Sequence, residues 1–386
     1  MADLKHFTDY LAGIRDEHLY REFTTAETVD DTHITINGTA YLNFSSNNYL
    51  SLSFHPGLIN TARQAATRHG TGGTSSRYVC GSNELYTALE ERIARFKGFE
   101  RALVFGSGYT ANLGAVMSLV DKQDLVIIDK LDHASIIDGI RLAGVPFRTF
   151  PHRDYRRLRA LLADTRKTYR TVLIITESIF SMDGDAADLA ELTRIRDEYD
   201  CLLMVDEAHA TGIFGARGSG MLEESGVRAD IEIGTLSKAI PSAGGYIAAS
   251  PVIIDVIRNR ARSLMYTTAL PPAALSVAHD AIDIIERMTK ERQAFRERCT
   301  GFASTLAAAG YIVYGTTSQI IPVRTGSNEA TLAAARALRE RGIFAVGMRP
   351  PTVPKGEGRI RFSICRGHTG DDIARLTEAV RDIIAV

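Results

Sequence analysis

The sequence is poor in cysteine, and the four cysteines it has are scattered. Cys80, Cys201, Cys299 and Cys365 lie far apart along the 386 residues. No two of them have the close spacing of a metal site or of a disulfide framework. Scattered cysteines of this kind are typical of a reducing compartment. We therefore expect a cytoplasmic protein that binds no metal.

The chain also lacks an excess of charge and a long apolar run. Lysine plus arginine number 45 and aspartate plus glutamate number 46, so there is no overall field to attract nucleic acid or an acidic membrane. No apolar run is long enough to span a bilayer, and the first six residues, MADLKH, carry no apolar signal core. We expect neither nucleic acid nor a membrane among the partners.

Repeats and low-complexity segments are absent too, and the length suits one large and one smaller domain. We predict an N-terminal helix and connector over residues 1–45, a large domain over 46–285 and a small domain over 286–386. Between residues 100 and 250, short apolar runs alternate with helical patterns, which predicts a mainly parallel sheet with helices on both faces. The runs lie at 102–105, 125–128, 172–176, 202–205 and 231–233.

Further elements are expected on either side of this region. Apolar residues at helical spacing predict helices, and short apolar runs bounded by turn residues predict strands. The expected helices cover about 4–20, 84–96, 273–302 and 330–341, and another begins near Gly108. The expected strands cover 41–44, 311–314, 320–323 and 359–362.

Two of the apolar runs end in polar side chains that suit one cofactor. The first run ends in Asp206 and His209, and the second leads into Thr235, Ser237 and Lys238. Parallel strands that deliver polar groups at their carboxyl ends build the site of an open α/β sheet. A carboxylate can keep a ring nitrogen protonated, a histidine can bond a phenolic oxygen, hydroxyls can bind a phosphate and a lysine can form an imine. Pyridoxal phosphate needs all four.

The motifs DEAHATG at 206–212 and GTLSKA at 234–239 resemble those of the α-oxoamine synthases. This family of pyridoxal phosphate enzymes condenses an amino acid with an acyl thioester and releases carbon dioxide. The resemblance runs from about Arg21 to His368. It implies an α/β, fold-type-I transferase with a mainly parallel seven-stranded sheet in a large domain and a smaller α+β C-terminal domain.

The resemblance also implies roles for individual residues. Bare amides at a helix N-terminus form an anion site, and we assign those of Gly108 and Tyr109 to the cofactor phosphate. The implied catalytic residues are Lys238, His133, Asp206 and His209. The implied cofactor contacts are Gly108, Tyr109, His133 (stacked on the ring), Ser181, Asp206, His209, Thr235, Ser237, Lys238 and Thr268. Because Thr268 matches a residue that reaches the neighbouring subunit's phosphate, a homodimer is expected.

Substrate contacts follow from the same resemblance. It implies that Arg21, His133 and Thr352 contact substrate, and that Asn47 and Arg361 lie at the carboxylate of the amino acid. Arginine suits that task because its planar fork binds a carboxylate bidentately. Arg359 is expected to be structural, on the view that it points to the opposite face of the strand. Glu177 is expected to face the substrate, and Asp183 to belong to a turn.

The run RPPTVP at 349–354 favours one branch of the family. That branch joins L-alanine to a pimeloyl thioester and forms 8-amino-7-oxononanoate, a step of biotin biosynthesis. Glycine or serine as the amino acid, another acyl chain, and coenzyme A or an acyl carrier protein as the donor all remain open. So do two other activities: a 2-amino-3-ketobutyrate ligase, and a catalytically silent regulator that keeps the fold.

Overall fold

A computed structural model of the chain describes residues 3–385, which form two compact units. The large unit comprises residues 50–181 and 186–293, and the small unit comprises residues 3–49, Met182–Asp185 and 294–385. The predicted division at residues 45/46 and 285/286 stays a prediction. Among the described residues, no helix is both long and apolar enough to cross a membrane.

The helices and strands of the large unit are these, in chain order: α2 Pro56–His69, the π-helix η1 Arg77–Gly81, α3 Glu84–Lys97, β4 Arg101–Phe105, α4 Gly108–Leu119, β5 Leu125–Asp129, α5 Ala134–Ala143, β6 Phe147–Phe150, α6 Tyr155–Thr165, β7 Val172–Glu177, α7 Leu189–Tyr199, β8 Leu202–Asp206, α8 Met221–Ser225, β9 Ile231–Ser237, β10 Pro241–Ala249, α9 Pro251–Arg260, α10 Arg262–Met265 and α11 Pro272–Arg287. Helix α12, Thr289–Ala308, continues into the small unit.

The other elements of the small unit are α1 Lys5–Asp16, β1 Glu27–Thr28, β2 His33–Ile36, β3 Thr39–Asn43, β11 Ile320–Gly326, α13 Asn328–Glu340, β12 Ile343–Phe344, β13 Val346–Met348, β14 Gly358–Ser363 and α14 Gly370–Ile383.

The large unit is built on one seven-stranded sheet in the order β4-β10-β9-β8-β7-β5-β6. Neighbouring strands from β9 to β6 are parallel, and β10 is antiparallel to both β4 and β9. A single strand therefore runs against the other six, and the prediction of a mainly parallel seven-stranded sheet is confirmed.

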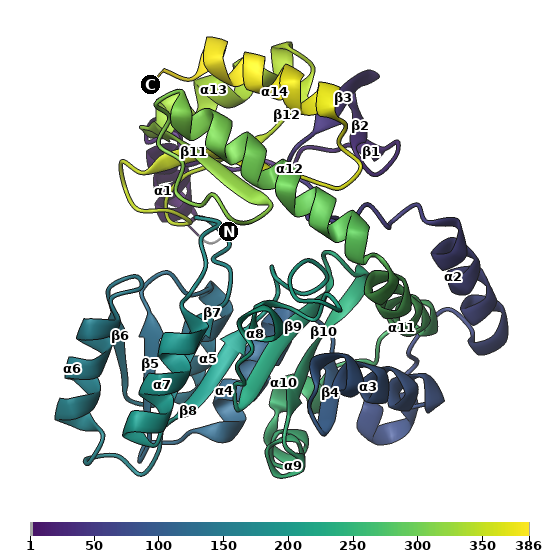
Figure 1. Cartoon of the computed structure of the whole chain (residues 1–386), viewed down its shortest axis with the longest axis vertical. Coiled ribbons are helices and arrows are strands. Elements are labelled where there is room, and N and C mark those ends of the chain that lie inside the picture. Colours follow the sequence, from purple (N-terminus) through teal and green to yellow (C-terminus); the bar gives the residue numbers. More distant parts are fainter. Residues whose placement is uncertain (1–2, 386) are drawn as a thin grey trace. The chain divides into compact units, whose positions relative to one another are not determined.

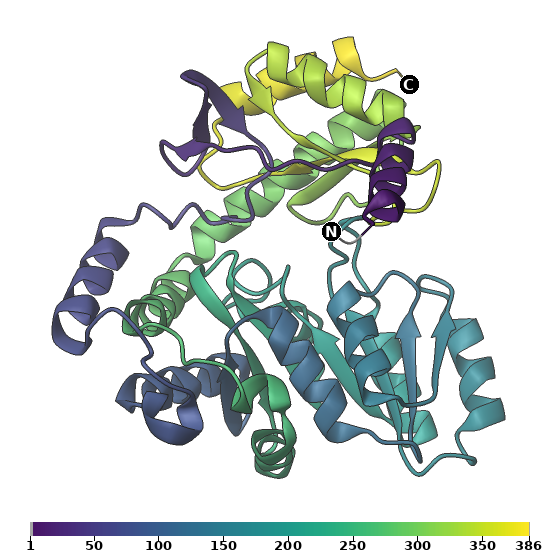
Figure 2. The ribbon, with the colours of Figure 1, turned by 180° about the vertical axis from the view of Figure 1, so that it is seen from behind.

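Both faces of this sheet are buried because alternate residues of each strand pack on opposite sides. On β7, Leu173 and Ile175 join the core beneath α4, α5 and α9. Val172 and Ile174 join the core beneath α6 and α7. Figures 1 and 2 show the two faces in turn. Because helices cover both faces, we expect the polar side chains of a site to lie at the ends of the strands.

The small unit contains two sheets. Strands β11, β14 and β13 form an antiparallel sheet, and β1, β2, β3 and β12 form the other. The ring of Phe362 on β14 lies edge-on to those of Phe44 and Phe302, and Phe44 stacks on His368 at 4.1 Å between ring centroids. These aromatic contacts join β14 to α12 and to the residue that follows β3.

Three predicted elements differ from the structure. The helix expected over 273–302 is two helices, because the Met288 amide bonds back to Ile285 and ends α11 in a tight turn. No glycine or proline marks that break. The strand expected at 311–314 is only a bridge between Val313 and Val323. The N-terminal helix ends at Asp16 rather than at residue 20.

Two strands of the seven-stranded sheet were missed, as were the short strands β1, β2, β12 and β13 of the small unit. The first residues of β10, PSAGG, read as a loop, and they do contain a bulge between Pro241 and Gly245. Strand β6 carries an exposed-exposed-exposed-buried pattern typical of an edge. Neither pattern shows the continuous apolar run that marks the central strands.

Candidate active site

A chain of side-chain hydrogen bonds ties the end of β8 to the start of α5. Asp206, the last residue of β8, accepts a hydrogen bond from Asn112 on α4 at 2.8 Å. Asn112 also donates to Ser135 Oγ at 3.0 Å, and Ser135 Oγ lies 2.8 Å from Nδ1 of His133. The chain fixes two predicted site residues, Asp206 and His133, relative to each other.

The surroundings of Asp206 favour its carboxylate form. The residue is buried, Oδ2 accepts the Asn112 amide hydrogen, and Oδ1 accepts the backbone N–H of Ala208 at 2.8 Å. Hydrogen bonds donated to a carboxylate stabilise its charge. A buried anion held in this way is suited to keep the nitrogen of a pyridine ring protonated.

Lys238 and His209 meet at the carboxyl ends of two neighbouring strands. His209 follows β8 and Lys238 follows β9, which pair in parallel. The Nζ atom of Lys238 lies 2.8 Å from Nε2 of His209. Asp206, His209 and Lys238 thus gather at one edge of the sheet, as their positions at strand ends predicted.

His133 is held as a neutral ring. Burial lowers its pKa, with Lys238 adding to that effect and Asp206 opposing it. Its Nδ1 atom accepts the backbone N–H of Ser135 at 3.3 Å, so that nitrogen carries no proton in this geometry. A neutral, fixed imidazole suits the predicted stacking on a cofactor ring.

A second group of predicted residues lies where α4 begins. Ser107 caps the helix through a capping box, and amides in the first helical turn, here those of Gly108 and Tyr109, have no partner within a helix. A Cβ built on Gly108 would contact Thr235, and Thr235 Oγ1 lies 2.7 Å from Ser237 Oγ. Two amides and two hydroxyls therefore lie together, a donor set that fits a phosphate group.

The close approach of these elements depends on glycine at position 245. A Cβ on Gly245 of β10 would overlap the backbone of Ser107 and Gly108. Any larger residue would push the start of α4 away from Thr235. The cradle for a phosphate is therefore built by the packing of α4 against β10.

The two remaining residues of the large unit that were predicted to contact the cofactor, Ser181 and Thr268, lie in different settings. Ser181 is buried, and its backbone N–H donates to Glu177 Oε2 at 3.2 Å. Thr268 is exposed and forms an antiparallel bridge with Ser76. Its predicted contact with a second subunit stays a prediction.

In the small unit, the two residues predicted for the amino acid's carboxylate are joined through a tyrosine. The guanidinium of Arg361 lies 3.4 Å from the hydroxyl of Tyr49, and that hydroxyl donates to Asn47 Oδ1 at 3.0 Å. Arg361 also donates to Ser363 Oγ at 2.7 Å. Tyr49 and Arg361 are both buried. The structure therefore brings Asn47 and Arg361 together within this unit.

Two other predicted substrate contacts, Arg21 and Thr352, lie at one turn of the small unit. Arg21 donates to the carbonyl of Pro350 at 3.0 Å, and the amide of Thr352 donates to the carbonyl of Arg349 at 3.1 Å. Burial lowers the pKa of Arg349, and the nearby charge of Arg21 lowers it further. Two arginines and an exposed threonine thus surround one turn, where an anion would relieve their repulsion.

Comparison with known proteins decides the family. The model of the family aminotransferase class I and II matches residues 39–380. The chain belongs to this family. The 8-amino-7-oxononanoate synthase of Geobacter sulfurreducens is 42% identical over 379 residues, which are 97% of this chain and 96% of that protein. The enzyme of the same name from Geobacter metallireducens is 43% identical over 377 residues, 96% of each chain.

Solved structures agree with this assignment. Serine palmitoyltransferase of Sphingomonas wittichii superposes with a TM-score of 0.93 at 29% identity, covering 100% of both chains. A serine palmitoyltransferase holding pyridoxal phosphate as an internal aldimine gives 0.93 at 27% identity, covering 99% of each. The 8-amino-7-oxononanoate synthase of Francisella tularensis gives 0.78 at 27%, covering 89% of this chain and 97% of that one. The predicted family and fold type are confirmed.

Membership of the family leaves one prediction to correct. Arg359 and Arg361 are two residues apart on β14, so strand alternation places them on the same face, not on opposite faces. Their partners distinguish them. Arg359 forms an ion pair with Asp183 and lies over the ring of Tyr314, so Asp183 is more than a turn residue.

Sequence reasoning missed the residues that support the site. Asn112 and Ser135 link Asp206 to His133, and Tyr49 links Asn47 to Arg361. One signal was available for Asn112, because asparagine is unfavourable inside a helix unless its side chain has a task. No comparable signal marks Ser135 or Tyr49.

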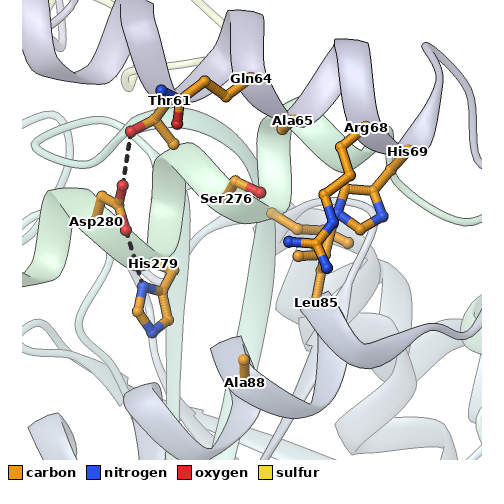
Figure 3. A pocket seen from close by; sticks show the side chains of 11 residues that line it. Thr61, Gln64, Ala65, Arg68, His69, Leu85, Ala88, Ser276, His279 and Asp280 are labelled. Carbon is orange, nitrogen blue, oxygen red and sulfur yellow. Dashed lines mark hydrogen bonds and ion pairs between the residues drawn. The ribbon is translucent and has the colours of Figure 1, made fainter.

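One further cavity in the large unit holds none of the predicted residues. It measures about 320 Å³ and lies between α2, α3 and α11. Thr61 donates to Asp280 at 2.6 Å and Asp280 pairs with His279, while Arg68 and His69 approach from α2 (Figure 3). Its lining is occupied by its own ion pairs and hydrogen bonds, and the predicted residues gather at the strand ends instead.

Proposed function

We propose that this protein is a pyridoxal phosphate enzyme that condenses L-alanine with a pimeloyl thioester to give 8-amino-7-oxononanoate, a free thiol and carbon dioxide. The observation that carries the proposal is the meeting of Lys238, His209 and Asp206 at neighbouring strand ends. The curated relatives named for this activity support the choice of substrates.

Each of the four predicted catalytic residues, all of which lie in the large unit, has a task in this chemistry. Bound pyridoxal phosphate supplies an electron-accepting ring to which the amine of the substrate is joined. Lys238 would bind the aldehyde of the cofactor covalently and, once released, would remove the Cα proton of alanine. Asp206 would keep the ring nitrogen protonated, His133 would cover the ring, and His209 would bond its phenolic oxygen.

The test is a matched set of assays on the purified holoenzyme. Pimeloyl thioesters of coenzyme A and of acyl carrier protein, and shorter acyl thioesters, are each combined with alanine, glycine or serine. We expect the highest kcat/KM with alanine and a pimeloyl donor. A preference for glycine with acetyl-CoA would establish the ligase alternative, and no turnover with any pair would favour the silent regulator.

The cellular setting and assembly are part of the proposal. The four cysteines are unpaired, and three of them are buried, which supports a reducing, cytoplasmic location. We propose a homodimer in which Thr268 of each chain reaches the other's cofactor. Support comes from an exposed apolar patch near Thr268, formed by Val79 and Tyr266, which are 77% and 73% exposed.

A substitution in that patch tests the dimer. Val79→Asp should yield a monomer with at least about tenfold weaker cofactor affinity, because it places a charge in an apolar contact. Analytical ultracentrifugation and cofactor titration measure both effects. Ile312→Asp is the control, since Ile312 is 54% exposed and belongs to the small unit, whereas the patch belongs to the large unit. A fully active Val79→Asp monomer would refute the shared site.

The two arginines of β14 give a second prediction. Arg361→Lys keeps the charge but loses the planar fork, so KM for alanine should rise about tenfold while KM for the thioester stays near its original value. Arg359→Lys should leave both KM values near the original, because the ion pair of Arg359 with Asp183 is structural. If Arg359→Lys weakened alanine binding instead, the carboxylate site would have to be reassigned to Arg359.

A further inference from the structure

Glu177 is a buried carboxyl group directly beside Asp206. Glu177 ends β7 and Asp206 ends β8, and the parallel register pairs these two residues. Paired residues on neighbouring strands point to the same face. Glu177 is 3% exposed, and it interacts electrostatically with both Asp206 and Lys238. It therefore belongs to the wall in which the proposed catalytic residues lie.

Hydrogen bonding distinguishes the two carboxyl groups. Both oxygens of Asp206 accept N–H groups, from Asn112 and Ala208. Glu177 Oε2 accepts the backbone N–H of Ser181, and the backbone N–H of His133 also favours the charged form of this group. Oε1, however, is buried and has no hydrogen-bond partner. Two adjacent buried carboxyl groups do not both ionise readily. The donors assign the charge to Asp206 and the proton to Glu177 Oε1.

The other charged groups around Glu177 support this assignment. Burial and then Asp206 raise the pKa of Glu177 to about 8, while Lys238 and the backbone N–H groups of Ser181 and His133 act in the opposite direction. Asp132, on the neighbouring β5 side, is also buried with a raised pKa, partly because of Glu177. Glu177 thus lies beside two other buried carboxyl groups, those of Asp206 and Asp132.

The proposed reaction needs an acid besides Lys238. Lys238 removes the Cα proton of alanine, and after carbon dioxide leaves it returns that proton to the same carbon. Formation of the new carbon–carbon bond breaks the carbon–sulfur bond of the thioester, and the departing thiolate must gain a proton to become the thiol. The overall reaction consumes one proton, and Lys238 cannot supply it.

We propose that Glu177 is this acid: it carries a proton on Oε1 in the resting enzyme, donates it to the sulfur of the leaving thiol, and regains a proton from solvent after each turnover. The inference rests on the proposed function. It assigns a catalytic role to a residue that resemblance placed only on the substrate side.

Glu177→Gln in the holoenzyme tests the role through the leaving group. With pimeloyl-CoA, kcat should fall about 10²-fold, a typical contribution of a general acid, and KM for alanine should change less than about threefold. With a p-nitrothiophenyl ester of pimelate, whose thiol leaves without protonation, the variant should regain most of the wild-type rate. An equal loss with both esters would overturn the proposal.

The pH profile gives a second comparison. Wild-type kcat with pimeloyl-CoA should decline as the pH rises through about 8, because ionised Glu177 has no proton to donate. The slower Glu177→Gln variant should lack this alkaline decline. Persistence of the same decline in the variant would assign it to another group and overturn the proposal.

Glu207→Gln is the matched control. Glu207 is equally buried, and burial raises its pKa to about 8 as well. Both its oxygens, however, accept backbone N–H groups, those of Met221 and Leu222 at 2.8 and 2.9 Å. Glu207→Gln should lower stability yet keep both the alkaline decline and the wild-type dependence on the leaving group.

The protonation state is measured without turnover. The infrared band of a protonated carboxyl group should be present at neutral pH in the wild-type protein, with and without cofactor, and reduced in Glu177→Gln. No difference between the two proteins would overturn the proposal even if the synthase activity is confirmed. If no thioester is turned over, the proposed function fails, and the infrared band still decides whether Glu177 holds a proton.

Discussion

Replacing Lys238 by alanine should reduce turnover by at least about 10³-fold while leaving the fold intact. In the proposed function the lysine has two tasks, imine formation and removal of the Cα proton, and alanine can perform neither. Its side chain is only half-buried and bonds to His209, so its loss leaves no cavity in the core. The visible absorption band of the imine should be lost together with the activity.

The measurement combines single-turnover kinetics with circular dichroism and thermal unfolding. Lys122→Ala serves as the control, because Lys122 is exposed and precedes β5, at the opposite end of the strands from Lys238. The control should keep both the absorption band and the activity. Near-normal turnover of the Lys238→Ala protein would remove the lysine, and with it the proposed chemistry, from this site.

The central sheet could be predicted because several of its strands are continuous apolar runs in the sequence. Runs such as LVII at 125–128 and VLIIT at 172–176 are apolar on both faces, which only a strand covered by two layers of helices requires. The residues at the ends of these runs then follow from topology, since parallel strands present their carboxyl ends at one edge. Lys238 and Asp206 were found in this way.

The parts that could not be predicted depend on contacts distant in sequence. Nothing near Asn112 shows that its amide will meet Asp206, 94 positions away. The break after Met288 leaves no mark either, since helical residues continue through it. The error on Arg359 is of another kind. Residues two apart on a strand point to the same face, and the prediction wrongly placed Arg359 and Arg361 on opposite faces.

A buried ion pair is a further contact between distant residues that the sequence does not predict. Lys97 ends α3, and its Nζ atom lies 2.5 Å from Glu232 on β9, with side-chain exposures of 1% and 3%. Lys97 also donates to Thr211 Oγ1 at 2.9 Å, and Gly234 leaves the room that the nearby ring of Tyr246 fills. From the sequence of α3 alone, Lys97 would be expected to be an ordinary, exposed basic residue in the last helical turn.

This pair predicts a large loss of stability when one partner is removed. Burial disfavours the charge of Lys97, but Glu232, helped by Tyr246 and Glu207, outweighs that effect and raises the pKa of Lys97 above its ordinary value. Lys97→Met leaves Glu232 buried without its cation, which should lower the free energy of unfolding by about 3–5 kcal/mol. The double variant Lys97→Met with Glu232→Leu should recover most of this loss, because an apolar pair needs no counter-charge.

The pH dependence has a definite sign. Without Lys97, the folded protein favours protonated Glu232, whose pKa then lies further above that of the unfolded chain. A carboxyl group with a raised folded pKa loses stability as the pH rises, since the unfolded state releases the proton. Denaturant unfolding of Lys97→Met should therefore show a larger deficit near pH 8 than near pH 5, while the double variant shows none. A deficit that is the same at both pH values, or equal in the single and double variants, would mean that lost packing, not the unpaired carboxylate, causes the instability.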